Sequence, residues 1–212
     1  ISACLVGSEM CIRDSFYRVR FMRGFNLLVV PGSPAVVAEL SPQDAAGRAI
    51  VAKARELTEG DTRPVEIVGS RDPRWRTEHT GSFRAWGADV HVGGGNYLPE
   101  LIARYILPGR TIGDSREHIQ PLNPDALTVV VVDGSAGLTP RAPLALIDGA
   151  TDTHDAMTAF LDGTGELPAD LPGVIEQGLW EELGALKASK SVLSSDDTLG
   201  VGRFLAACEV HA

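Results

Sequence analysis

The segment Leu127-Thr128-Val129-Val130-Val131-Val132-Asp133-Gly134-Ser135 decides the fold of this chain. An unbroken apolar and β-branched run that ends in an Asp-Gly-Ser turn is typical of a strand buried on both faces of a sheet. Two other segments are predicted to be strands: residues 25–30, an apolar run that ends at Pro31-Gly32, and residues 64–68, which end at Gly69-Ser70. Strands of this kind occur in parallel sheets that helices cover on both faces, so the sequence predicts an α/β protein.

Helical patterns alternate with these strands. Residues 41–59 form the clearest one, because Ser41 suits an N-cap, Pro42 suits a first turn and Gly60 suits the end of a helix. Further helices are predicted over residues 97–107, 152–161 and 171–188, and short strands over residues 89–92 and 199–207. The polar stretch that follows residues 108–109 is predicted to be a loop. The alternation predicts a three-layer sandwich, with a mostly parallel central sheet between two layers of helices.

The first residues of the sequence do not belong to this pattern. Met10-Cys11-Ile12-Arg13-Asp14-Ser15 matches the translation of a transposase adapter used for sequencing libraries, a string that occurs in translated metagenomic assemblies. Residues 1–21 are therefore interpreted as a non-native leader, adapter-derived and then read through, and residues 22–212 as a single α/β domain that starts at Met22. The alternative interpretation is a short native arm.

Charge and composition argue against several classes of function. The formal net charge is −9 at pH 7, whereas nucleic acids and anionic membranes attract clustered Lys and Arg, so neither is predicted as a partner. No apolar run approaches the ~20 residues that span a bilayer, and the chain is predicted to be cytoplasmic. Outside the leader, Cys208 is the single cysteine, so we expect no internal disulfide and no all-cysteine zinc site.

Polar residues that directly follow the three central strands form the candidate site. Ser33 follows the first run, Ser70 follows the second, and Asp133 and Ser135 follow the third. In open α/β sheets, ligands bind at the carboxyl ends of the strands, so these side chains are predicted to line one pocket. The alternative is that Gly, Ser and Asp occur at strand ends simply because turns require them.

A long polar loop supplies one further candidate. Residues 71–87 are rich in Arg and exceed an ordinary connection, which indicates a functional or capping loop. Within it, His79 is the best single histidine for chemistry, although a loop histidine can equally serve only as a hydrogen-bonding group. Gly93-Gly94-Gly95-Asn96 suits either an anion-binding nest or a flexible turn, and it lacks the spacing of a phosphate loop. No G-x-S-x-G elbow of a serine hydrolase is present.

Several of these segments resemble a known family. They are the opening Val29-Val30-Pro31-Gly32-Ser33-Pro34, the loop His79-Thr80-Gly81-Ser82-Phe83, and residues 132–143 and 153–157. In order and spacing they are similar to the bacterial proteins described as LigB-like, the family of the class III extradiol dioxygenases. The resemblance runs from about residue 27 to residue 204, and it implies that family's α/β fold.

The resemblance also implies a ring-cleaving site that this sequence does not preserve. Active enzymes of the class hold a non-haem Fe(II) with two histidines and a glutamate, and use another histidine as acid/base. The first metal histidine belongs where this chain has Ser33, and the acid/base histidine where it has Ala136; the second metal histidine falls near Ser70 or is served by His79. Serine is a poor substitute for an imidazole ligand, and alanine cannot move a proton. No cofactor and no metal site is therefore predicted.

Three functions stay open at this point. The first is a non-catalytic domain that has lost iron and binds a small molecule or a partner protein. The second is an active metal-dependent oxidoreductase of the ring-cleaving type, in which His79, with Asp133 or Asp72, holds Fe(II) in a rearranged ligand set. The third is a structural or assembly protein whose pocket has collapsed. A ligand-sized cavity floored by Ser33, Ser70 and Asp133 is the observation that counts against the third.

Overall fold

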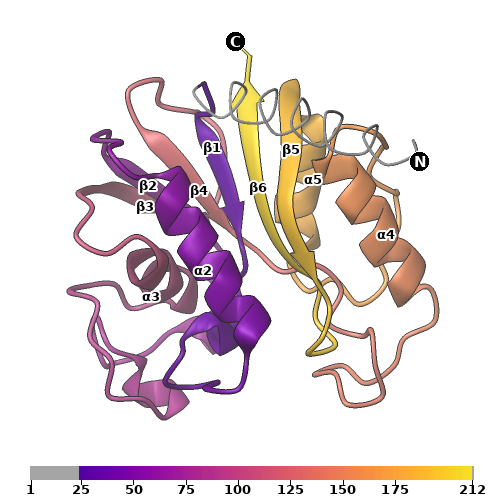
Figure 1. Cartoon of the computed structure of the whole chain (residues 1–212), viewed down its shortest axis with the longest axis horizontal. Coiled ribbons are helices and arrows are strands. Elements are labelled where there is room, and N and C mark those ends of the chain that lie inside the picture. Colours follow the sequence, from indigo (N-terminus) through magenta and orange to yellow (C-terminus); the bar gives the residue numbers. More distant parts are fainter. Residues whose placement is uncertain (1–23, 212) are drawn as a thin grey trace, which may run out of the picture.

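The computed structural model describes residues 24–211, so the expected leader over residues 1–21 lies outside the described residues. A six-stranded sheet runs through the middle of the described chain (Figure 1). Its strand order is β3-β2-β4-β1-β6-β5. The strands are β1 (Leu27–Val30), β2 (Val65–Gly69), β3 (Ile112–Arg116), β4 (Leu127–Val131), β5 (Ala188–Asp196) and β6 (Arg203–Val210).

The sheet is mixed, and the prediction of a mostly parallel sheet is wrong. Strands β3, β2, β4 and β1 run parallel to one another, whereas β6 is antiparallel to both of its neighbours, β1 and β5. The connection between β5 and β6 spans only residues 197–202. A connection this short can join only antiparallel strands, because a parallel pair needs a crossover of a dozen or more residues.

Four helices of residues 24–211 complete the α/β fold. They are α2 (Ala45–Leu57), α3 (Leu98–Ile106), α4 (Ala150–Leu161) and α5 (Gln177–Ala185). Each lies within or close to a predicted helix, but Asp44, and not Ser41, caps α2 by accepting the N–H of Gly47 at 3.0 Å. Ala188, the last residue of the predicted helix over residues 171–188, instead begins β5, a strand that the sequence pattern does not predict. Within residues 24–211, no helix is both long and apolar enough to cross a membrane.

The helices pack against opposite faces of the sheet, and the alternation of β1 shows how. Leu28 and Val30 join a core cluster with α2 and α3, whereas Leu27 and Val29 join a second cluster with α4 and α5. Successive side chains of a strand point to opposite faces, so an unbroken apolar run fills both clusters. In Figure 1, α2 and α3 accordingly lie on one side of the sheet and α4 and α5 on the other.

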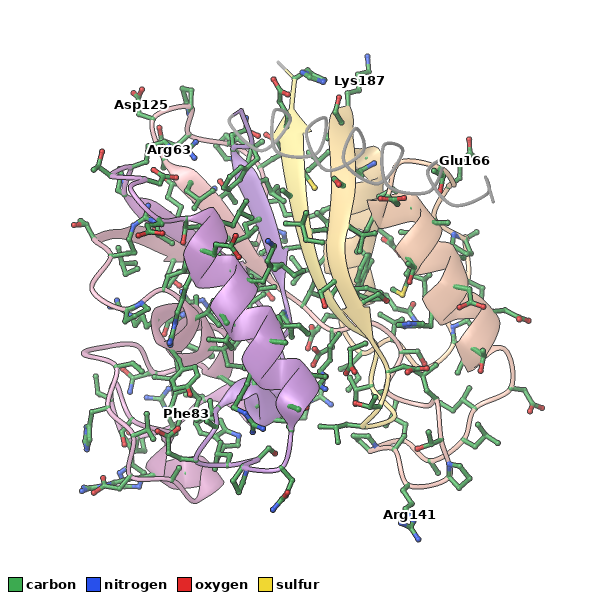
Figure 2. The ribbon with its side chains drawn as sticks, in the orientation of Figure 1. Arg63, Phe83, Asp125, Arg141, Glu166 and Lys187 are labelled. Carbon is green, nitrogen blue, oxygen red and sulfur yellow. The ribbon has the colours of Figure 1, made fainter. Side chains whose placement is uncertain are left out.

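The long loop between β2 and α3 contains two single-turn 3-10 helices, η2 (Pro73–Trp75) and η3 (Phe83–Trp86). Phe83 is fully buried in the cluster of α2 and α3, and Figure 2 shows it at the end of the sheet where β1 terminates. The strand predicted over residues 89–92 is absent: His91 makes only an isolated bridge to Ser82. The loop is therefore anchored on the fold at that end of the sheet.

Candidate pocket at the carboxyl ends of the parallel strands

A cavity of about 140 Å³ lies where β1, β2 and β4 end. These strands are adjacent and parallel, so the residues that follow them meet at one edge, the lower end of the sheet in Figure 1. Ser33, Ser70 and Asp133 all line this cavity. The structure therefore brings the three strand ends together at one pocket. The walls are largely apolar and include Pro34, Trp75, Leu98, Pro143, Ile175 and Val201.

Gly69 explains how α3 approaches the pocket so closely. A Cβ atom at this position would lie 2.3 Å from Cβ of Pro99, a distance that real side chains do not adopt. Pro99 stands in the first turn of α3 and itself lines the cavity. The glycine at the end of β2 therefore lets the start of α3 form one wall of the pocket.

Asp133 provides a carboxylate at the floor. Its Oδ1 accepts the backbone N–H of Gly32 at 2.8 Å, and the N–H of Ser33 also donates to the carboxylate. Its backbone carbonyl accepts the indole N–H of Trp180 at 2.8 Å. Burial raises the pKa of the carboxyl to about 6, although the two N–H donors and the charge of Arg203 act in the opposite direction. Asp133 is thus held in place from both its side chain and its main chain.

The two serines serve both turns and the pocket. Ser33 Oγ accepts the N–H of Ala35 at 3.3 Å and caps the 3-10 helix η1 (Pro34–Val36). Ser70 Oγ accepts the N–H of Asp72, also at 3.3 Å. Because a hydroxyl that accepts one hydrogen bond can still donate another, these local roles leave both O–H groups able to donate to a bound molecule.

Glu176 is a pocket residue that the sequence did not indicate. It precedes α5, lines the cavity, and its Oε1 accepts the indole N–H of Trp75 at 3.0 Å. Its charge adds to the rise in the pKa of Asp133. The helix predicted over residues 171–188 places Glu176 in a helix interior, so no strand-end signal points to it.

Ser135 and His79 lie elsewhere. Ser135 is fully buried, does not line the cavity, and pairs with Val174 in an isolated bridge, while its Oγ accepts the N–H of Gly137 at 3.3 Å. His79 is exposed and also does not line the cavity; its backbone N–H donates to Oγ1 of Thr77 at 3.0 Å. The structure therefore brings Ser33, Ser70 and Asp133 together and leaves these two outside.

The glycine-rich segment before α3 pairs with the loop that contains His79. The N–H of Gly81 donates to the carbonyl of Gly95 at 2.7 Å, and the N–H of Thr77 donates to the carbonyl of Asn96, also at 2.7 Å. The Asn96 amide further donates to the carbonyl of Thr77 at 2.9 Å. Residues 95–96 are therefore tied to the neighbouring loop by hydrogen bonds, which the interpretation as a flexible turn does not include.

The residues of the pocket do not fit an Fe(II) site. Its ionisable side chains are the carboxylates of Asp133 and Glu176, and no histidine of the described chain lines it. Across residues 24–211, no three His, Cys, Asp or Glu side chains are grouped so that they could hold a metal ion. Asp72 is held by Arg74 at 2.8 Å, so the rearranged set of His79 with Asp133 or Asp72 is not assembled.

A buried ion cluster lies behind the pocket floor. Arg203, at the start of β6, is fully buried and donates to both carboxylate oxygens of Asp44 and to Asp196. The guanidinium is not an isolated charge in the core, because two carboxylates accept its hydrogen bonds. Nearby, His154 stacks on Phe204 with 5.1 Å between ring centroids.

Comparison with known proteins adds no family assignment. No protein-family model matches the chain, and no curated protein matches it.

Proposed function

We propose that this protein is a non-catalytic, metal-free relative of the LigB-like class III extradiol dioxygenases that binds a small molecule in the strand-end pocket. The cavity of about 140 Å³ is the observation that supports this most. It is close to the ~150 Å³ of an engineered apolar cavity that binds benzene, so it suits a molecule of about one aromatic ring. We also propose that the sheet and its two helix layers correspond to the three-layer sandwich of that family.

The loss of ring cleavage follows from the residues at the expected positions. Ala136 lines the pocket where the resemblance places the acid/base histidine, and Ser33 where it places a metal ligand. Without an imidazole in the cavity, neither the ligand set nor the proton transfer of the active enzymes has its side chains. The open cavity in turn disfavours a purely structural role with a collapsed pocket. A protein partner and a cytoplasmic location remain predictions.

Metal content tests the metal-free part of the proposal. Elemental analysis of protein purified anaerobically with Fe(II) available is expected to give far less than one iron per chain. Iron close to one per chain would overturn it and support the alternative of an active oxidoreductase with rearranged ligands.

A substitution that blocks the pocket tests whether a small molecule binds there. Benzyl alcohol, followed by ligand-observed NMR, is a suitable one-ring probe. Ile175 is 38% exposed and lines the cavity, so Ile175→Trp can enlarge a side chain at the mouth without filling the core. We expect this variant to weaken binding at least tenfold. Leu199→Trp is the matched control, because Leu199 is 43% exposed and does not line the cavity. Equal binding by the two variants would show that the probe does not occupy the pocket.

A further inference from the structure

The carboxylates of the pocket differ from the other sheltered carboxylates of the fold. Neither Asp133 nor Glu176 forms an ion pair with any side chain of residues 24–211. By contrast, an arginine pairs with each of several half-buried or buried carboxylates elsewhere: Asp44, Asp61, Glu66, Glu100 and Asp196. Taking a carboxylate out of water is costly unless a partner compensates it. The pocket therefore contains two carboxylates that no arginine, lysine or histidine of residues 24–211 pairs with directly, although Arg203 and Arg74 lie near enough to act on them.

We propose that the pocket selects a small organic cation, an ammonium compound of about one ring, whose charged group binds the Asp133 carboxylate while its apolar part contacts the cavity walls. This inference rests on the proposed function, and it specifies the chemical class of the ligand. An ammonium group has three N–H donors and no acceptor, which suits a site whose ionisable groups are carboxylates. The apolar walls suit the remaining part of such a molecule.

The groups around Asp133 are negatively charged on balance as well. Glu176 adds a second carboxylate to the wall, and the buried cluster behind the floor joins one guanidinium, Arg203, to the two carboxylates of Asp44 and Asp196. Arg74, near Glu176, is itself paired with Asp72. A concave site with low-dielectric walls concentrates such a field, so a cation is attracted and an anion repelled.

A comparison with anionic and neutral ligands supports the choice of a cation. An anionic ligand would bring a further negative charge against Asp133 and Glu176, and close charges of like sign repel strongly where water is excluded. A neutral ligand would displace water from a carboxylate without replacing its charge compensation. A cation alone both fills the apolar space and restores the missing partner.

Three matched probes test this inference: benzylammonium, benzyl alcohol and benzoate, measured at pH 8 by isothermal titration calorimetry. They share one ring and differ in charge. We expect benzylammonium to bind at least tenfold more tightly than benzyl alcohol, and benzoate more weakly than either. Asp133→Asn should remove the preference for the cation and retain binding of the alcohol. Glu176→Gln should reduce the preference by a smaller factor.

Asp125→Asn is the control for loss of a carboxylate. Asp125 is exposed, and Figure 2 shows it at the opposite end of the sheet from Arg141, so its charge does not reach the pocket at close range. This variant should bind all three probes as the wild type does. If Asp133→Asn does not fold, Glu176→Gln tests the negative charge of the pocket at a residue that is only half-buried.

The outcomes separate this inference from the proposed function. If benzyl alcohol binds as tightly as benzylammonium, the pocket binds small molecules without selecting cations, and only this inference is overturned. If none of the three probes binds, the proposed function fails as well. A preference for benzylammonium that survives both Asp133→Asn and Glu176→Gln would place the cation outside the pocket and overturn the inference.

Discussion

Replacing Asp133 with asparagine should change how the stability of the protein depends on pH. Burial raises the pKa of this carboxyl from 3.8 to about 6 in the folded protein. Because the folded state then holds the proton more strongly than the unfolded state, stability decreases as pH rises between these two values. Below about pH 4 the group is protonated in both states and contributes no such penalty. The sign is therefore opposite to that of a salt-bridged aspartate.

The size of this effect follows from the shift. The rise in the pKa of Asp133 from 3.8 to about 6 corresponds to about 3 kcal/mol of free energy of unfolding in total. About 1.5 kcal/mol of this falls between pH 5 and pH 8. Asp133 keeps partial exposure to the pocket, so these values are upper bounds. Asparagine does not ionise in this range. The free energy of unfolding of Asp133→Asn, relative to that of the wild type, should therefore increase by about 1 kcal/mol from pH 5 to pH 8.

Urea unfolding at the two pH values measures this difference directly. Subtracting the wild type cancels the contributions of other carboxyls, such as Asp44 and Asp61, whose pKa values are lowered by their arginine partners despite burial. Asp125→Asn again serves as the control, and its difference from the wild type should not change with pH by this amount. An equal stability difference for Asp133→Asn at pH 5 and pH 8 would refute the assignment of a sheltered, raised-pKa carboxyl to the pocket floor.

Two further predictions concern the framework around the pocket. Arg203→Met should lower the free energy of unfolding by about 3–5 kcal/mol, because Asp44 and Asp196 lose the guanidinium that compensates their buried charge. Urea unfolding measures this loss of stability. A loss below about 1 kcal/mol would show that the cluster is dispensable. Gly69→Ala should cost about 1–3 kcal/mol, because its methyl group would collide with Pro99. An unchanged thermal midpoint for Gly69→Ala would contradict the close approach of α3 to β2.

The central strands are predictable because their sequence signal is local. The runs that form β1, β2 and β4 are mostly apolar, with Glu66 and Thr128 as exceptions, since residues of both strand faces contact a core cluster. The edge strands β3 and β5 have no such signal. β3 reads Ile-Gly-Asp-Ser-Arg and β5 mixes Ser, Lys and Asp with apolar residues, because an edge strand is half-exposed and polar side chains protect it. Without β5, the sequence pattern indicates a mostly parallel sheet.

The candidate site is predictable to the same extent. Ser33, Ser70 and Asp133 meet because the ends of adjacent parallel strands must meet, which is a rule of topology and needs no knowledge of side-chain packing. Glu176 lies at the end of the connection from α4 to α5, and Leu171 and Val174 of this connection join the second core cluster. No local sequence pattern encodes this packing. Ser135 follows the same strand as Asp133, yet it is turned into the core against residues 173–174.

Mapping of amide chemical shifts during titration with benzylammonium tests the central claim most directly. The backbone N–H groups of Gly32 and Ser33 donate to the Asp133 carboxylate, so a cation bound there must perturb them. We predict saturable shifts concentrated at residues 32–33 and 133–134, with little change around Asp125. Shifts confined to other regions, or no shifts at millimolar probe, would contradict a small-molecule pocket at the ends of these strands.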